Sequence, residues 1–455
     1  MRNIFKKLHL WISIPFGLVI TVTCFTGALL IFEDEITAAC RGDVMTVSPQ
    51  GEPLSFEKIV QTVEATLSDG VEITGIVVPS APDEAYKVNL SKPKRAALYV
   101  NQYTGEIKGE SERLPFFATV FRLHRWLLDT NPGDGAIFWG KMIVGASTLS
   151  FVIILVTGLV IWWPRNRKML KNRLSILFCR GYKRLFYDLH VAGGFYALLL
   201  LLVMALTGLT WSYEWYRNGV NSLFGIEAAV VPSVKEQKTA HSAVKAQAVC
   251  INDCSRCVDK PCQGTKNDTP VADGNSGATE LVADGSSGAT ELAADGSSGA
   301  IELVADGNSS ATELLADGNS GATELLAESN ASPSRYALWQ KAYRMLAAEI
   351  GTRTMTVSAG TISVPLEGWG NSRAADKYSF DESNGELTTV RSYAEAQPRE
   401  KLQGWIYTLH VSSWGGLLSR ILGFLAALLG ATLPLTGYYF WIKRLYGKRT
   451  AGKRD

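Results

Sequence analysis

The hydrophobic residues of this chain are concentrated in four long stretches. Each contains more than 20 mostly apolar residues, and together they cover residues 8–32, 142–163, 191–211 and 421–442. At about 1.5 Å per residue, a helix of this length crosses a hydrocarbon core of about 30 Å. We therefore expect a membrane protein with four transmembrane helices, which excludes a soluble single-domain enzyme, a disordered chain and a small disulfide scaffold.

Shorter patterns between the spans predict two α+β domains. In the first, apolar residues at helical spacing predict a helix over 55–65, and strand-like runs follow at 73–78, 85–90, 97–101 and after the turn at 103–107. The second repeats this order, with a helix over 335–349, an Asn384-Gly385 hairpin turn, and strands over 354–358, 361–365, 377–381 and 386–390.

A polar insertion precedes the second α+β domain. Residues 271–325 are five tandem copies of an 11-residue unit, with ten acids and no Lys or Arg. Such a repeat could form a solenoid, but each copy has few large apolar residues, so we expect disorder. Four closely spaced cysteines lie just before it, in a pattern typical of neither zinc nor iron–sulfur sites. We favour disulfides over a metal site for them; they are Cys250, Cys254, Cys257 and Cys262.

Positive charges flank the predicted spans on one side only. The net charge is +2, but Lys and Arg gather in residues 2–7, 165–184 and 443–454. The positive-inside rule places these segments in the cytoplasm. We therefore expect a multi-pass protein of a bacterial inner membrane, with both termini cytoplasmic and both α+β domains periplasmic. The first apolar stretch is too long for a signal peptide and no A-x-A-like site follows it, so we interpret it as a retained anchor.

These features predict an all-α four-helix transmembrane bundle with two α+β periplasmic domains. We expect the first transmembrane helix in 1–36, the first α+β domain in 37–115, a histidine-bearing helix and the second transmembrane helix in 116–165, a basic loop in 166–188, and the third transmembrane helix in 189–216. The linker with the cysteines and repeats covers 217–332, the second α+β domain 333–400, another histidine-bearing helix and the fourth transmembrane helix 401–444, and a tail 445–455. The second half thus repeats the order of the first, which indicates a duplication.

Four of the five histidines occupy matched positions in the two halves; they are His9, His124, His190 and His410. Two open the first and third spans, and the other two follow a leucine shortly before the second and fourth spans. Each span also ends in Thr-Gly. His9 and Gly27 are 18 residues apart, or five whole helical turns, and so are His190 and Gly208. A single histidine at a helix end is usually interfacial, but two matched pairs favour a binding role.

Two histidine pairs at opposite faces of a four-helix bundle suit two b-type haems. By the predicted topology, His9 and His190 would hold one haem near the cytoplasmic face, and His124 and His410 the other near the outer face. No C-x-x-C-H motif occurs, which excludes covalent attachment. The Thr-Gly glycines either give room for the macrocycle or allow close helix packing. Tryptophans near the span ends could line haem pockets or form an aromatic belt.

Three motifs carry a resemblance to a known family. Leu-His-x-Trp at 123–126, Thr-Gly-Leu-Val-Ile-Trp-Trp at 157–163 and Tyr-Thr-Gly-Glu-Ile at 103–107 resemble the PepSY-associated transmembrane family, over nearly all of the chain outside about 235–332. That family includes iron-regulated inner-membrane proteins and ferric-siderophore reductases. The resemblance implies PepSY-like α+β domains, and haem-dependent electron transfer across the membrane to periplasmic ferric iron. The repeats and the four cysteines depart from the family pattern.

No other cofactor or catalytic site is evident, and we assign no catalytic residue. Flavin and nicotinamide motifs are absent, so the electrons would come from a quinol or a cytoplasmic donor. The basic loop would contact anionic lipid or, less simply, an acidic flavoprotein. We expect no nucleic-acid partner. Two alternatives remain open: a non-catalytic regulator whose PepSY-like domains bind an envelope partner, and a transport-associated membrane protein.

Overall fold

The computed structural model describes residues 2–93, 96–130, 136–226 and 333–451 of the 455-residue chain. The four-cysteine cluster and the acidic repeats lie outside the described residues. The chain divides into two compact units, the first formed by Met1–Tyr216 and Gly288–Asp455 and the second by Arg217–Ser287. Helix α10 (Glu214–Leu223) begins in the first unit and ends in the second. All other elements described here belong to the first unit.

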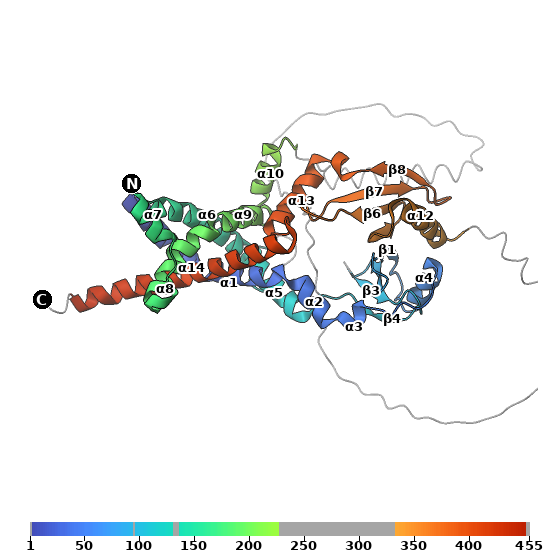
Figure 1. Ribbon diagram of the computed structural model, residues 1–455, viewed down its shortest axis with the longest axis horizontal. Coiled ribbons are helices and arrows are strands. Elements are labelled where there is room, and N and C mark those ends of the chain that lie inside the picture. The colour runs from blue at the N-terminus through green and yellow to red at the C-terminus, as the bar shows by residue number, and fades with distance from the viewer. Residues whose placement is uncertain (1, 94–95, 131–135, 227–332, 452–455) are drawn as a thin grey trace, which may run out of the picture. The chain divides into compact units, whose positions relative to one another are not determined.

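Four helices of the first unit are long and apolar enough to cross a membrane. They are α1 (Arg2–Ile31), α6 (Trp139–Trp162), the segment Tyr182–Ser212, and the segment Gly416–Tyr446 of α14 (Gly416–Ala451). The third comprises α8 (Tyr182–Asp188), a π-helical turn (Leu189–Gly193) and α9 (Gly194–Ser212). Helix α1 packs against α6 and α14, and α9 packs against the same two helices (Figure 1). The prediction of a membrane protein with four transmembrane helices is confirmed.

The strands and their two covering helices follow the sequence predictions to within two residues. The first half contains α4 (Phe56–Glu64), β1 (Ile73–Val78), β2 (Tyr86–Leu90), β3 (Ala97–Val100) and β4 (Ile107–Glu110). The second contains α12 (Arg335–Ile350), β5 (Met355–Ser358), β6 (Thr361–Pro365), β7 (Ala375–Phe380) and β8 (Leu387–Arg391). Ser55 and Ser334 cap α4 and α12 by accepting hydrogen bonds from backbone N–H groups of the first turn, as serine commonly does.

The two predicted α+β domains are joined in the structure. Their strands form one antiparallel sheet in the order β4-β3-β2-β1-β5-β6-β7-β8, with β1 paired to β5 (Figure 1). Ile76 and Val357 are partners in this pairing and neither is exposed to solvent. Helices α4 and α12 pack together, and the buried residues of both halves form a single core. The pairing covers two strand edges that would otherwise expose unpaired backbone groups.

Two short helices connect the sheet to the transmembrane helices. Helix α5 (Pro115–Trp126) follows β4 and leads to α6, and α13 (Pro398–His410) follows β8 and leads to α14. Each begins with proline at its first position, where the missing N–H costs nothing. The remaining elements are α2 (Glu33–Cys40), α3 (Gly42–Met45), α7 (Arg167–Leu174) and the 3₁₀ turns Phe178–Arg180 and Tyr393–Glu395. Helices α5 and α13 carry His124 and His410, the two matched histidines that lie outside the spans.

Candidate functional site

The four matched histidines meet in two pairs. His9 of α1 lies beside His190 of the π-helical turn, with ring centroids 6.4 Å apart. His124 of α5 lies beside His410 of α13, with ring centroids 6.2 Å apart. We call His9 and His190 the first pair, and His124 and His410 the second pair. These are the pairings that the sequence predicted; a role as haem ligands stays a prediction.

Every one of these imidazoles is held by the same contact to a neighbouring transmembrane helix. The Nδ1 atom lies at hydrogen-bonding distance from a backbone carbonyl three residues before a Thr-Gly dipeptide. The distances are 3.1 Å for His9 to Ile154, 2.9 Å for His124 to Thr23, 3.2 Å for His190 to Leu433, and 2.9 Å for His410 to Met204. A carbonyl oxygen can only accept, so Nδ1 must carry the proton. This tautomer leaves the lone pair on Nε2, the nitrogen that is then available to a metal.

The threonine of each Thr-Gly adds a second contact to Nδ1. Its hydroxyl donates to a carbonyl of its own helix, so its oxygen can accept from the imidazole. The Nδ1–Oγ1 distances are 3.1 Å for His9 and Thr157, 3.3 Å for His124 and Thr26, 2.9 Å for His190 and Thr436, and 3.1 Å for His410 and Thr207. These threonines belong to the Thr-Gly pattern of the sequence, which by itself does not indicate that they contact the histidines.

The glycine of each Thr-Gly lies against the imidazole ring, and at Gly27 and Gly208 its missing side chain makes room for the ring. A Cβ atom placed on the glycine would approach the ring Cε1 to 2.9 Å at Gly27 and His124, 3.2 Å at Gly208 and His410, 3.4 Å at Gly158 and His9, and 3.7 Å at Gly437 and His190. The sequence offered two roles for these glycines, space for a macrocycle or close helix packing. The structure gives them a different contact, with the histidine side chain itself.

Helix α1 and the third span, Tyr182–Ser212, each contribute to both pairs. Helix α1 carries His9 of the first pair, and its Gly27 accepts the ring of His124 from the second. Eighteen residues of helix separate them, which places the two levels about 27 Å apart along α1. The equal spacing of His190 and Gly208 repeats this arrangement in the second half. His9 and Gly27 lie on one face of α1, as their spacing of five whole turns indicates. They belong to different pairs, so this face connects the two pairs and does not line a single pocket.

The ring-centroid separation within each pair matches that expected for two imidazoles bound to one metal ion. A five-membered ring with bonds of about 1.33 Å has its atoms about 1.1 Å from its centre. A first-row metal binds an imidazole nitrogen at about 2.0–2.1 Å. Two imidazoles on opposite sides of one ion would thus have centroids about 6.2–6.4 Å apart. The observed separations are 6.2 and 6.4 Å.

The donor set suits a haem iron better than a bare ion. Structural and catalytic zinc sites use three or four protein ligands. Among the residues that the structure describes, no group of three or more His, Cys, Asp and Glu side chains could hold a metal. A haem brings four ligands of its own, so its iron needs only two axial imidazoles. Each pair provides two.

The environment of the second pair keeps both rings neutral. Burial lowers the pKa of His124 to about 4, with the Thr23 carbonyl opposing the shift and Arg125 adding to it. Burial also lowers the pKa of His410 to about 4. Neutral imidazole is the form that binds a metal. No proton therefore has to be removed from this pair near pH 7 before a ligand can bind.

Further groups lie around the pairs; of these, Trp162 is one of the tryptophans at span ends that the sequence offered as pocket lining. The Trp211 ring lies 5.0 Å from that of His410, edge to face. Two buried hydroxyl groups near the second pair, on Thr23 and Ser412, have no hydrogen-bond partner within the described part of the chain. On the side of the first pair, Nε of Arg2 and Nε1 of Trp162 are also buried and have no hydrogen-bond partner among the described residues. Such buried polar atoms usually have a partner, and a bound group could supply one.

These features define a class: a four-span membrane protein with an eight-stranded sheet and two half-buried histidine pairs, each held by Thr-Gly on a neighbouring helix. The family model for the PepSY-associated TM region matches residues 6–444. The chain therefore belongs to the PepSY-associated transmembrane family. A comparison with curated proteins found no match.

Proposed function

We propose that this protein is a haem-containing reductase of the bacterial inner membrane that passes electrons across the membrane to periplasmic ferric iron, carried by a siderophore. The observation that carries this proposal is the repeated geometry of the two histidine pairs. Four imidazoles have the same Nδ1 anchor, and both pairs have the centroid separation that one bis-imidazole iron requires. A single pair of this kind could be a packing accident, but two in matched positions support a common role.

The chain's own residues prepare each pair for an axial ligand role. The carbonyl and threonine contacts fix each ring and its tautomer, so that Nε2 carries the free lone pair. A b-type haem bound at each pair would supply a one-electron carrier. Tightly packed apolar side chains between the two levels, including Leu155 and Leu201, exclude water from the interior of the bundle. That environment favours electron transfer without accompanying ion movement.

Two haem sites are needed because a single site cannot lie close to both membrane faces. The levels of His9 and Gly27 are about 27 Å apart along α1, close to the thickness of a hydrocarbon core of about 30 Å. Each pair therefore lies within reach of one face. The basic segments at residues 2–7, 165–184 and 443–454 support a cytoplasmic location for the first pair. Electrons would then enter at the first pair from a quinol or a soluble donor and leave at the second.

Electron transfer across liposomes tests this proposal. The full chain is reconstituted with a reductant enclosed and a ferric siderophore outside, and ferrous iron is measured outside with a chelating dye. One electron converts each Fe(III) to Fe(II). We expect reduction by the wild-type protein, and a loss to the background of empty liposomes in His9→Ala and His124→Ala. His241, the fifth histidine, provides the matched control, and His241→Ala should retain the wild-type rate.

The alternatives give different results in the same preparation. A folded, colourless protein without reductase activity would contradict the proposal and favour a regulator or a transport-associated protein. A coloured protein that reduces no external iron would retain haem binding but contradict transfer to a ferric substrate. Orientation is tested separately by reporter fusions after Asp455, which should be active only in the cytoplasm.

A further inference from the structure

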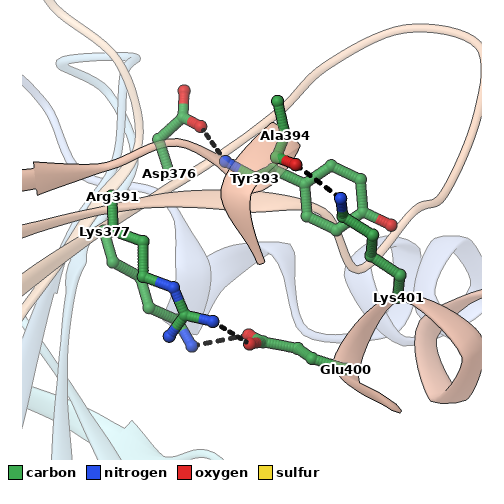
Figure 2. Close-up of polar contacts among 7 residues, drawn as sticks. All are labelled: Asp376, Lys377, Arg391, Tyr393, Ala394, Glu400 and Lys401. Atoms are coloured by element: carbon green, nitrogen blue, oxygen red, sulfur yellow. Dashed lines mark hydrogen bonds and ion pairs between the residues drawn. The ribbon is translucent and has the colours of Figure 1, made fainter. Parts of the chain in front are cut away.

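The helix that carries His410 is attached to the sheet by an ionic contact at its beginning. The Glu400 carboxylate, in the first turn of α13, accepts hydrogen bonds from Lys377 of β7 at 2.7 Å and from Arg391 of β8 at 3.2 Å. Figure 2 shows both cations reaching the carboxylate from the sheet, and Lys401 donating to the Ala394 carbonyl of the turn that precedes α13. The first turn of α13 is therefore fixed to the last two strands.

A buried polar contact holds the middle of the same helix. Asn371, in the connection between β6 and β7, is 7% exposed and lies against Gly404. A Cβ atom on Gly404 would approach the Asn371 amide nitrogen to 2.3 Å, so only glycine leaves room for this side chain. The Asn371 amide donates to the Tyr393 hydroxyl at 2.6 Å, and its oxygen accepts from the fully buried Thr408 hydroxyl at 3.0 Å. Thr408 is two residues before His410.

The last turn of α13 is attached to the same connection. The Thr408 hydroxyl also accepts from the backbone N–H of Ser372 at 3.0 Å. Beyond the helix, the N–H of Gly370 donates to the Trp414 carbonyl at 2.9 Å. Strands β7 and β8 thus contact α13 in its first turn, and the β6–β7 connection contacts its middle and its end. His410 cannot shift along or around the helix axis without breaking several of these contacts.

Helix α5, which carries the other histidine of the second pair, is held differently. It packs against the transmembrane helices α1 and α6, and its buried residues are Phe117 and Val120. Both helices begin with proline, and Phe117 stands two residues after that proline in α5, where Glu400 stands in α13. An apolar contact in one half therefore takes the place of an ion pair in the other. Arg113, just before α5, pairs with Glu33, just after α1.

We propose that Asn371, Thr408 and Glu400 are positioning residues that fix α13 to the sheet and thereby set the place of His410 relative to His124. The consequence is mechanical: α5 packs against the transmembrane helices α1 and α6, whereas α13 is held both by α9 and by these contacts to the strands and the β6–β7 connection. A displacement of strands β7 and β8 changes the second pair and leaves the first unaltered. This inference rests on the proposed function as far as haem is concerned, but the attachment of α13 can be measured without haem.

Amide hydrogen exchange of the full chain measures the attachment directly. Thr408→Val removes the hydroxyl at nearly constant volume, and Thr408→Ser retains it. We expect exchange in residues 402–410 to become roughly tenfold faster in Thr408→Val, as expected for loss of buried hydrogen bonds, and to stay within about twofold of wild type in Thr408→Ser. Gly404→Ala should also accelerate exchange because it expels Asn371, although alanine favours the helix itself. Thr119→Val in α5 is the matched control, since that hydroxyl bonds only within its own helix.

The haem-loaded protein gives the second readout. In Thr408→Val and Gly404→Ala we expect a changed low-spin electron paramagnetic resonance signal and midpoint potential for one haem, with the other unchanged, and rescue of both in Thr408→Ser. Unaltered exchange in both variants would overturn the proposal, as would equal changes at both haems or in Thr119→Val. Glu400→Gln serves if the buried variants do not fold, and wild-type exchange in its first helical turn would also overturn the proposal. A wild-type protein without haem would contradict the proposed function, while the exchange comparison would still decide the attachment of α13.

Discussion

Gly27→Ala should displace the second histidine pair by adding a single methyl group. The new Cβ would lie 2.9 Å from Cε1 of His124, whereas non-bonded carbon atoms prefer about 3.5–4.0 Å. The ring must therefore retreat by about 0.6 Å or more. Its Nδ1 is 2.9 Å from the Thr23 carbonyl, so a retreat of that size stretches the hydrogen bond beyond its normal range. It also exceeds the tolerance of about 0.2 Å for a metal–ligand distance.

The four Thr-Gly positions provide an internal series for this prediction. Gly208 has a corresponding distance of 3.2 Å, Gly158 of 3.4 Å and Gly437 of 3.7 Å, and the last is an ordinary contact. We therefore expect Gly27→Ala to lose most of one haem, Gly208→Ala to lose less, and Gly437→Ala to retain both. Alanine is the better helix former at every position, so loss of helix propensity cannot explain a loss of haem.

The assay is the haem-to-protein ratio of purified full-length variants, measured from the reduced pyridine complex, with thermal unfolding as a check on folding. Gly27→Ala should give about half the wild-type ratio with nearly unchanged unfolding temperature. A full complement of haem in Gly27→Ala would refute the steric reasoning. So would a loss in Gly437→Ala as large as that in Gly27→Ala.

Three further predictions follow from the same contacts and from the sequence. Thr436→Val removes the hydroxyl 2.9 Å from Nδ1 of His190 but keeps the backbone carbonyl, so the first haem should stay bound with a shifted midpoint potential; a redox titration identical to wild type would contradict this. The hydrogen bond from Lys377 lowers the pKa of Glu400 below its ordinary 4.5, so the stabilisation from this contact is present above that pH and is lost as the pH falls through the lowered pKa. Glu400→Gln should therefore reduce the melting temperature at pH 7 by at most a few degrees, because an exposed ion pair contributes no more than about 1 kcal/mol. The difference from wild type should shrink below about pH 4. A difference that grows on acidification would contradict the predicted direction of the pH dependence. Deletion of residues 271–325 should preserve haem content and expression, because the repeats offer little apolar surface to bury; loss of stable protein would show that they pack.

Local patterns in the sequence predicted the elements of the sheet but not the joining of its halves. The short strand-like runs at Ile73–Val78 and at the segment that became Met355–Ser358 identified both strands. The two strands are separated by 276 residues of chain (79–354), and nothing in the sequence of either strand identifies its partner. A strand that is apolar on one face fits any neighbour whose edge is free, so the pattern favoured two separate domains equally well. Ile76 and Val357 are partners across the two strands and are both fully buried, which shows that the two halves share one sheet and one core.

The candidate site was predictable to the level of residue pairs. Duplication made the pairing visible, because His9 matched His190 and His124 matched His410 in position. The partners of Nδ1 were not predictable, since backbone carbonyls carry no sequence signature. The same holds for the attachment of α13: Asn371 and Glu400 are ordinary polar residues in the sequence, and only the burial of Asn371 and the contacts of both residues distinguish them.

Haem stoichiometry of the purified full chain tests the central claim most directly. The account predicts two haems per chain for the wild type and for His241→Ala. It predicts one haem for His9→Ala and for His124→Ala, each with a different surviving signal. A wild-type ratio near zero, or the same ratio in both variants as in the wild type, would contradict the assignment of the two histidine pairs as haem sites.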